Sequence, residues 1–309
     1  MLRFLSLLGG RGVTLLFAGV FLGLALPDMA ALLRPLLAPS VVLLLFFSLL
    51  RIEWLSVRSH LGRPLLTAGL VGWMLLASPI LAWMLLTQLP LPGSLSTAII
   101  LMAAAPPILG STAIALLLGL DGALTLVVGL LSTFLAPLTI PPLVFWLLNL
   151  ELDVGAWELM LRLVGIIVPA LLGAVAARRF AGADWLRQNS SSIDGCIVLT
   201  MLIFAVAIMD GVTATLIERP AVVLLWLFAS FVANPALQVI TILCFWSLGR
   251  RLAFTAGLMA GNCNMGLMLA ALPADADFDV ILYFAVAQIP MYMLPAMTKP
   301  LYRRLLAPA

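Results

Sequence analysis

Long apolar stretches separated by short polar connections dominate this chain. Most are close to the roughly 20 residues that a helix needs to cross a bilayer core. They are too long and continuous to be the alternating strands of a membrane barrel. Because hydrocarbon cannot hydrogen-bond to backbone groups, we expect each stretch to be helical. The pattern predicts an all-α integral membrane protein with ten transmembrane helices, at residues 12–26, 36–50, 64–87, 96–119, 123–148, 157–177, 193–214, 220–248, 254–272 and 278–298.

The ninth predicted span, residues 254–272, is interrupted in its middle by Gly261, Asn262, Asn264 and Gly266. Gly is a poor helix former, and each Asn amide carries hydrogen-bonding groups that lipid cannot satisfy. Such an interruption is typical of transporters, in which loosened backbone lines a substrate cavity. The alternative is that the asparagines bind a neighbouring helix and the glycines permit close packing.

The fourth predicted span, residues 96–119, has a comparable interruption at Pro106, Pro107 and Gly110. Spans four and nine hold equivalent places if the chain consists of two halves with five spans each. Because an odd number of spans inverts the second half, the pattern predicts an inverted five-plus-five repeat with crossed broken helices 4 and 9. Coincidence is the alternative, since Pro and Gly are frequent in membrane helices.

Composition and charge support a membrane location. The chain is 64% hydrophobic and 9% charged, whereas about a quarter of a soluble protein is charged. With the N-terminus in the cytoplasm, every basic residue except Arg34, Arg162 and Arg219 falls in a cytoplasmic segment. We therefore expect an integral protein of the cell (inner) membrane, surrounded by the lipid bilayer, with both termini cytoplasmic. Nothing in the charge pattern supports nucleic-acid binding.

Catalytic constellations are missing from the sequence. The single histidine, His60, lies in a basic connection, which leaves no histidine base or zinc ligand inside the membrane. Asp194 and Asp210 share one predicted helix and stand roughly four turns apart, too far for an aspartate dyad. The three cysteines are widely spaced and predict neither a disulfide framework nor a metal site. We expect no enzyme activity, and no cofactor beyond a coupling ion.

Neutral oxygen-bearing side chains surround the two interruptions. Free N–H groups at half-helix ends attract anions, and free carbonyl groups can hold cations. Asp210 is the deepest intramembrane acid and the candidate proton carrier, although a position near the outer end of its span also suits a structural role. The candidate oxygen donors are Ser111, Thr112, Thr125, Ser132, Thr133, Asn262 and Asn264.

Three segments, residues 103–112, 132–137 and 261–267, together resemble the bile acid:sodium symporter family. The likeness extends over nearly the whole chain as a ten-span pattern. It implies a single membrane transporter unit in which a core domain moves against a panel domain; we expect a monomer or a weak homodimer. The implied panel domain comprises spans 12–50 and 157–214, and the implied core domain comprises spans 64–148 and 220–298.

The resemblance also implies roles for single residues. Ser111, Thr112 and Thr125 fall where the family places oxygen ligands of a sodium ion. Asn264 falls on an asparagine that faces the substrate in the family.

Other positions depart from the family pattern, and each departure removes oxygen or charge. Met259 stands in place of the glutamate used in both sodium sites, Cys263 in place of a glutamine, Gly129 in place of a hydroxyl ligand and Met74 in place of a third-span glutamine. Gln288 falls on the first residue of a His-Asn pair near the substrate. A mid-membrane cation without a carboxylate keeps its charge uncompensated. We therefore expect cation binding at Ser111, Thr112, Thr125, Met259 and Cys263 to be weak or vestigial.

The sequence thus predicts a secondary active transporter of a small organic anion, working by alternating access. Substrate contacts are expected at Asn262, Asn264, Gln288, Ser111 and Thr112. The departures argue against sodium coupling, so that a proton, exchange or the substrate's own gradient is the expected driving force. The alternatives are an auxin-carrier-like or arsenite-exporter-like permease on the same plan, or a non-transporting membrane binding protein.

Overall fold

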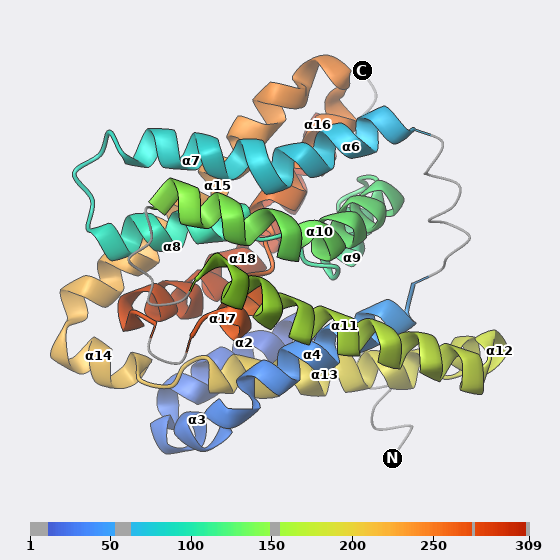
Figure 1. Cartoon of the computed structure of the whole chain (residues 1–309), viewed down its shortest axis with the longest axis horizontal. Helices are drawn as coiled ribbons and strands as arrows, with labels where there is room; N and C mark the ends of the chain where they lie inside the picture. The colour runs from blue at the N-terminus through green and yellow to red at the C-terminus, as the bar shows by residue number, and fades with distance from the viewer. Residues whose placement is uncertain (1–11, 53–62, 149–154, 274–275, 307–309) are drawn as a thin grey trace. The chain divides into compact units, whose positions relative to one another are not determined.

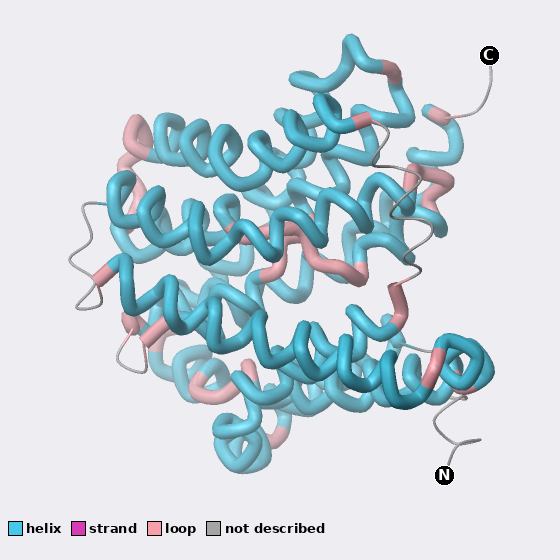
Figure 2. Tube along the Cα trace, turned by 45° about the vertical axis from the view of Figure 1, so that its right-hand side comes forward, coloured by secondary structure: helices cyan, strands magenta, loops and turns pink. Residues whose placement is uncertain are grey.

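The computed structural model describes residues 12–52, 63–148, 155–273 and 276–306, and within these ranges every regular element is a helix (Figures 1 and 2). His60 lies outside the described residues. The all-α fold class is therefore confirmed for the part of the chain that the structure describes.

Seven helical stretches within the described ranges are long and apolar enough to cross a membrane. They coincide with the second, third, fifth to eighth and tenth predicted spans, and they identify an integral membrane protein. Their bounds are Pro27–Leu50 (α3, η1 and α4), Pro64–Leu86 (α6, η2 and α7), Gly122–Leu148 (α10), Ala156–Ala181 (α11), Ser190–Glu218 (α13 and α14), Pro220–Leu248 (α15 and η3) and Phe278–Tyr302 within α18 (Phe278–Leu305).

The first two predicted spans differ in length from the observed helices. Helix α2, Gly12–Ala25, has 14 residues, and residues 1–11 lie outside the described part of the chain. The second span was expected to begin at residue 36, but the helical stretch begins at Pro27. Proline suits the first turn of a helix, where its missing N–H has no intrahelical partner. The 3₁₀ turn η1, Arg34–Leu36, then carries the chain past Pro35 into α4, Leu37–Leu50.

The fourth and ninth predicted spans are both interrupted. The fourth consists of α8, Gly93–Ala104, with 12 residues, and α9, Ser111–Leu117, with 7 residues. The ninth consists of α16, Arg250–Gly261, with 12 residues, and α17, Met265–Ala271, with 7 residues. The predicted interruptions are thus confirmed.

Local chemistry explains where both interruptions fall. Pro106 and Pro107 have no N–H to continue α8, and a residue that precedes proline is pushed out of the helical region. Ala105 accordingly has φ −66° and ψ 138°. At the second interruption, Asn262 and Asn264 have ψ values of 63° and 69°, also outside the helical region.

The chain divides into two compact units. Unit 1 comprises Met1–Glu53 and Val164–Leu224, and unit 2 comprises Trp54–Leu163 and Leu225–Ala309. Both interrupted helices belong to unit 2. The functional labels of panel and core are not tested by this division and stay predictions.

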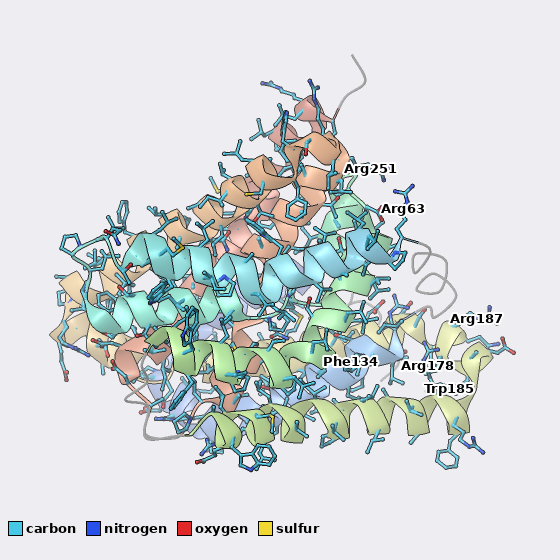
Figure 3. The ribbon with its side chains drawn as sticks, turned by 45° about the horizontal axis from the view of Figure 1, so that its top comes forward. Arg63, Phe134, Arg178, Trp185, Arg187 and Arg251 are labelled. Carbon is cyan, nitrogen blue, oxygen red and sulfur yellow. The ribbon has the colours of Figure 1, made fainter. Side chains whose placement is uncertain are left out.

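In unit 1, α13 (Ser190–Ala207) packs against α2 and α4. Gly19 and Gly23 allow this close approach, because a Cβ at Gly23 would lie 2.8 Å from both the Cβ of Met209 and the carbonyl oxygen of Val206. The basic residues Arg178 and Arg187 lie toward one end of this unit (Figure 3).

In unit 2, α8 packs against α7 (Ser78–Leu86), α10, α17 and α18. A second buried cluster joins Leu118 and Leu120, which follow α9, to Phe254 and Leu258 of α16 and to Tyr302 of α18. The half-helices are therefore held by apolar packing on both sides of each interruption. Arg63 and Arg251 lie toward one end of this unit (Figure 3).

Candidate functional site

The two interruptions meet and hydrogen-bond to each other. The N–H of Ile108 donates to the carbonyl oxygen of Asn262 at 2.8 Å, and the N–H of Asn264 donates to the carbonyl oxygen of Pro106 at 2.7 Å. Pro107 and Cys263 lie opposite each other in an isolated antiparallel bridge. Backbone groups in one interruption, which have no partner within their own helix, thus bond to backbone groups in the other interruption. Such pairing is required in apolar surroundings.

Hydroxyl groups follow the first interruption. Ser111 and Thr125 are fully buried, and their hydroxyls donate to the carbonyl oxygens of Ile108 at 2.6 Å and Asp121 at 2.8 Å. The hydroxyl oxygen of Thr112 is buried without a hydrogen-bond partner within the described residues. The three predicted sodium ligands therefore keep lone pairs available, but no acidic residue occurs in α9 or α10 to balance a cation.

Asn262 is 1% exposed, and its hydrogen bonds define its orientation. Its Nδ2 donates to the carbonyl oxygen of Leu258 at 2.9 Å, so its Oδ1 points away as an acceptor. This Oδ1 has no partner in the described part of the chain. A buried polar atom without a protein partner is expected to meet water or a ligand.

Ser132 carries a third buried oxygen without a partner among the described residues. It lies three residues after Gly129 on α10, and thus on the same helix face. A Cβ at Gly129 would lie 3.3 Å from Cδ2 of Leu109 and 3.6 Å from the carbonyl oxygen of Pro107. This face of α10 therefore borders the first interruption at Pro107 and Leu109, in the loop that is hydrogen-bonded to Asn262.

Asn264 and Gln288 have partners within their own elements. Asn264 is the N-cap of α17, and its Oδ1 accepts from the N–H of Leu267 at 3.1 Å. Gln288 is 2% exposed, and its Nε2 donates to the carbonyl oxygen of Phe284 at 3.2 Å. Its helix α18 packs against α17 and α8. Neither residue's predicted substrate contact is tested by this geometry.

The second predicted cation site does not fit a sodium ion. Met259 is fully buried, and the thiol of Cys263 donates to the carbonyl oxygen of Ala260 at 2.9 Å. The carbonyl oxygen of Leu258 accepts from both the backbone N–H and the side-chain Nδ2 of Asn262. The carbonyl oxygens of Leu258 and Ala260 thus already accept hydrogen bonds from the protein, and no carboxylate is present in α16 or α17.

A buried polar network on α15 (Pro220–Phe245) was not predicted from the sequence. Asn234 is 2% exposed, and its Nδ2 donates to the carbonyl oxygen of Gly261 at the second interruption. The Nε2 of Gln238 donates to Oδ1 of Asn234 at 2.8 Å, and the hydroxyl of Tyr302 donates to Oε1 of Gln238 at 3.4 Å. Two amides four residues apart in an apolar span are a signal that could have drawn attention to this helix.

Asp210 belongs to unit 1 and not to the unit that holds the interruptions. It lies between α13 and α14 (Val212–Glu218), beside Gly211 with φ 77°. Its carboxylate is 2.9 Å from Nη1 of Arg34. The predicted proton carrier therefore has an arginine partner, a geometry that by itself suits a structural ion pair.

Helical spans with two interruptions hydrogen-bonded to each other define a class, the membrane transporters built on broken helices. Comparison with protein families gives a match to the model described as the Sodium Bile acid symporter family, over residues 38–214. The match covers more than half of the chain, and the chain belongs to this family. The predicted resemblance is confirmed, and the first interruption lies inside the matched range. A search of curated proteins finds no match.

Proposed function

We propose that the protein is a secondary transporter of a small organic anion that binds at the joined interruptions of unit 2. The observation that supports this most directly is the set of buried oxygens on Thr112, Ser132 and Asn262 that have no hydrogen-bond partner among the described residues. Membership of a transporter family supports transport over mere binding.

The donors and acceptors in this region favour a particular kind of anion. The hydroxyls of Thr112 and Ser132 can donate to a carboxylate oxygen, whereas Oδ1 of Asn262 can only accept. The backbone N–H groups of Ser111 and Thr112 already donate to carbonyls of the preceding loop. The substrate that suits this set is a small carboxylate that also carries a hydroxyl or N–H group.

An inverted repeat of ten spans is part of the proposal. Each interrupted span consists of 12 and then 7 helical residues. Helix α8 contacts α17 and α9 contacts α16, so that exchanging the two spans reproduces the same pairings. The two backbone hydrogen bonds between the interruptions, Ile108 to Asn262 and Asn264 to Pro106, are likewise placed symmetrically about the bridge between Pro107 and Cys263. In this proposal, unit 1 is the panel and unit 2 the core, and substrate crosses as one moves against the other.

Transport in proteoliposomes tests the proposal. We expect saturable uptake of at least one radiolabelled anion from a set containing taurocholate and small hydroxy- and amino-carboxylates. Thr112→Val should reduce that uptake, because it removes a hydroxyl without changing the side-chain shape. Thr139→Val is the matched control, since the Thr139 hydroxyl lies toward the helix surface and bonds only to its own helix, at the carbonyl of Leu135.

Other outcomes separate the alternatives. Saturable binding of a probe without uptake would indicate a membrane binding protein. Uptake of arsenite or indole-acetate, with no uptake of the other anions, would favour the permease alternatives. Equal activity of Thr112→Val and Thr139→Val would remove Thr112 from the substrate site.

Coupling is proposed to be independent of sodium, because carbonyls at the second cation site already accept internal hydrogen bonds and neither α9 nor α10 carries an acidic residue at the first. We expect uptake to continue when sodium is replaced by potassium or choline at constant pH. A steep and saturable loss of uptake without sodium would contradict this part of the proposal.

A further inference from the structure

It is unusual that only neutral side chains contact the C-terminal end of α16. The last carbonyls of a helix have no intrahelical donors and carry the negative end of the helix dipole. Inside a membrane such an end is a natural cation site. Here the carbonyl oxygen of Gly261, the last residue of α16, accepts a hydrogen bond from Nδ2 of Asn234.

The hydrogen bonds fix which atom of each amide faces the helix end. A carbonyl can only accept, so Asn234 must present Nδ2 to Gly261 and turn Oδ1 away. That Oδ1 then accepts from Nε2 of Gln238, which leaves Oε1 of Gln238 to accept from the hydroxyl of Tyr302. The network is a directed chain of donors that ends at the carbonyl of Gly261.

Two glycines bring α16 close enough to α15 for this contact. A Cβ at Gly257 would lie 2.5 Å from Cγ1 of Ile242 and 2.9 Å from the carbonyl oxygen of Gln238. A Cβ at Gly261 would overlap the side chain of Gln238. The donor chain therefore occupies the space directly beside the helix end, and a bound ion would have to displace it.

We propose that Asn234 is a fixed internal donor that takes the place of a bound cation at the end of α16, held in that orientation by Gln238 and Tyr302. Asn234 is thus a positioning residue for the second interruption. One consequence, that transport needs no cation at this position, rests on the proposed function. The position of the Asn234 donor can be tested without any transport assay.

Asn234→Asp tests the inference through cation dependence. The substitution replaces the donor by a carboxylate that faces the carbonyl of Gly261, and two acceptors at hydrogen-bond distance need a cation or a proton between them. We expect the detergent-solubilised variant to unfold at a lower temperature in choline chloride than in sodium chloride, with a difference of at least about 3 °C. Lowering the pH in choline should recover part of this loss.

The full-length wild type and Asn189→Asp are the matched controls. Asn189 lies outside this network, and its Nδ2 donates to the carbonyl oxygen of Trp185. Both controls should unfold at the same temperature in sodium and in choline at equal ionic strength. A residue that only supported packing would lower the unfolding temperature equally in both salts.

The results that would overturn the inference are specific. Saturable stabilisation of the wild type by sodium would show that a cation still binds there. Asn234→Asp that responds neither to sodium nor to pH, or that fails to fold even when purified in sodium, would also refute it. Failure of all uptake assays, with the expected unfolding temperatures, would count against the proposed function and leave the assignment of Asn234 intact.

Discussion

Some side chains at the interruptions bond to the protein backbone, and others keep an atom available for a ligand. Their hydrogen bonds show which residues belong to each group. Ser111, Thr125 and Asn264 each bond to a nearby backbone group, so part of their value is local stability. Thr112 and Asn262 each keep an oxygen that nothing in the described residues satisfies. Because a buried acceptor without a donor is costly, these two residues are the stronger candidates for substrate contact.

Asn264 can be separated into its two roles by a pair of substitutions. Asn264→Ala removes the cap of α17 and should lower stability by about 0.5–2 kcal/mol. Asn264→Ser keeps an N-cap oxygen and should restore stability. If the amide also contacts substrate, both variants should lose affinity by roughly 5- to 150-fold.

Thermal unfolding and equilibrium binding of a transported anion check these expectations for Asn264. Wild-type affinity in Asn264→Ser would assign the residue to capping alone.

Met259→Glu tests whether a sodium site can be restored by one carboxylate. The Met259 side chain is completely buried, and the nearby carbonyls of Leu258, Ala260 and Gly261 already accept hydrogen bonds. We expect the variant to be destabilised, without gaining sodium-dependent uptake, because a buried unpaired carboxylate is costly. Unfolding temperature and uptake in sodium against choline are the measurements. Sodium-dependent activity in this variant would show that the remaining ligands of the site are still in place.

Helix packing in unit 1 depends on the small residues of α2. Gly23→Ala places a methyl group against Met209 and the backbone of Val206, and overpacking of this kind costs about 1–3 kcal/mol. Gly165→Ala in α11 is the matched control, because a Cβ there meets nothing within 4 Å. Thermal unfolding should therefore show a clear loss for Gly23→Ala alone. Equal stability of the two variants would mean that α2 can shift without cost.

Two ion pairs tie the same antiparallel helices of unit 1 together at opposite ends. Arg34 pairs with Asp210, and Arg51 pairs with Asp194 at 2.7 Å. The rise per residue places the two pairs about 25 Å apart, similar to the thickness of the hydrocarbon core. Such a separation puts Asp210 at a membrane boundary and favours its structural role.

Asp210→Asn should accordingly change little. The Arg34 and Asp210 side chains are 59% and 19% exposed, and an ion pair with an exposed partner contributes about 1 kcal/mol. We expect uptake to keep any response to a pH gradient, measured in proteoliposomes with an imposed gradient. Loss of that response in Asp210→Asn, with normal folding, would restore this residue as the proton carrier.

Helix positions could be predicted from the sequence where they depend on the length of an apolar stretch or on the presence of proline and glycine. The interruptions at Pro106 and Asn262 were therefore predicted, as were most long spans. The contact between Asn234 and Gly261 was not, because it depends on side chains of separate helices and on which amide atom faces the carbonyl. The start at Pro27 was not predicted, because a proline and an aspartate after an apolar stretch are as typical of the end of one helix as of the start of the next.

The orientation of the whole molecule in the membrane can be tested by labelling single cysteines. An even number of spans with a cytoplasmic N-terminus places Gln88 outside and Trp185 inside. In a background with the native cysteines replaced by alanine, we expect an impermeant maleimide to label Gln88→Cys on intact cells. Trp185→Cys should react only after permeabilisation. The reverse pattern would invert the topology, and labelling of both on intact cells would require an even number of spans between them.

The two hydrogen bonds that join the interruptions also make a natural reporter of conformational cycling. The amides of Ile108 and Asn264 are each protected by a carbonyl of the opposite span, not by their own helix. Any state in which the spans separate would expose both protons to solvent at once, although the two residues are far apart in the sequence. Hydrogen–deuterium exchange at these amides would then follow one shared rate. That rate would measure how often the two interrupted spans separate from each other.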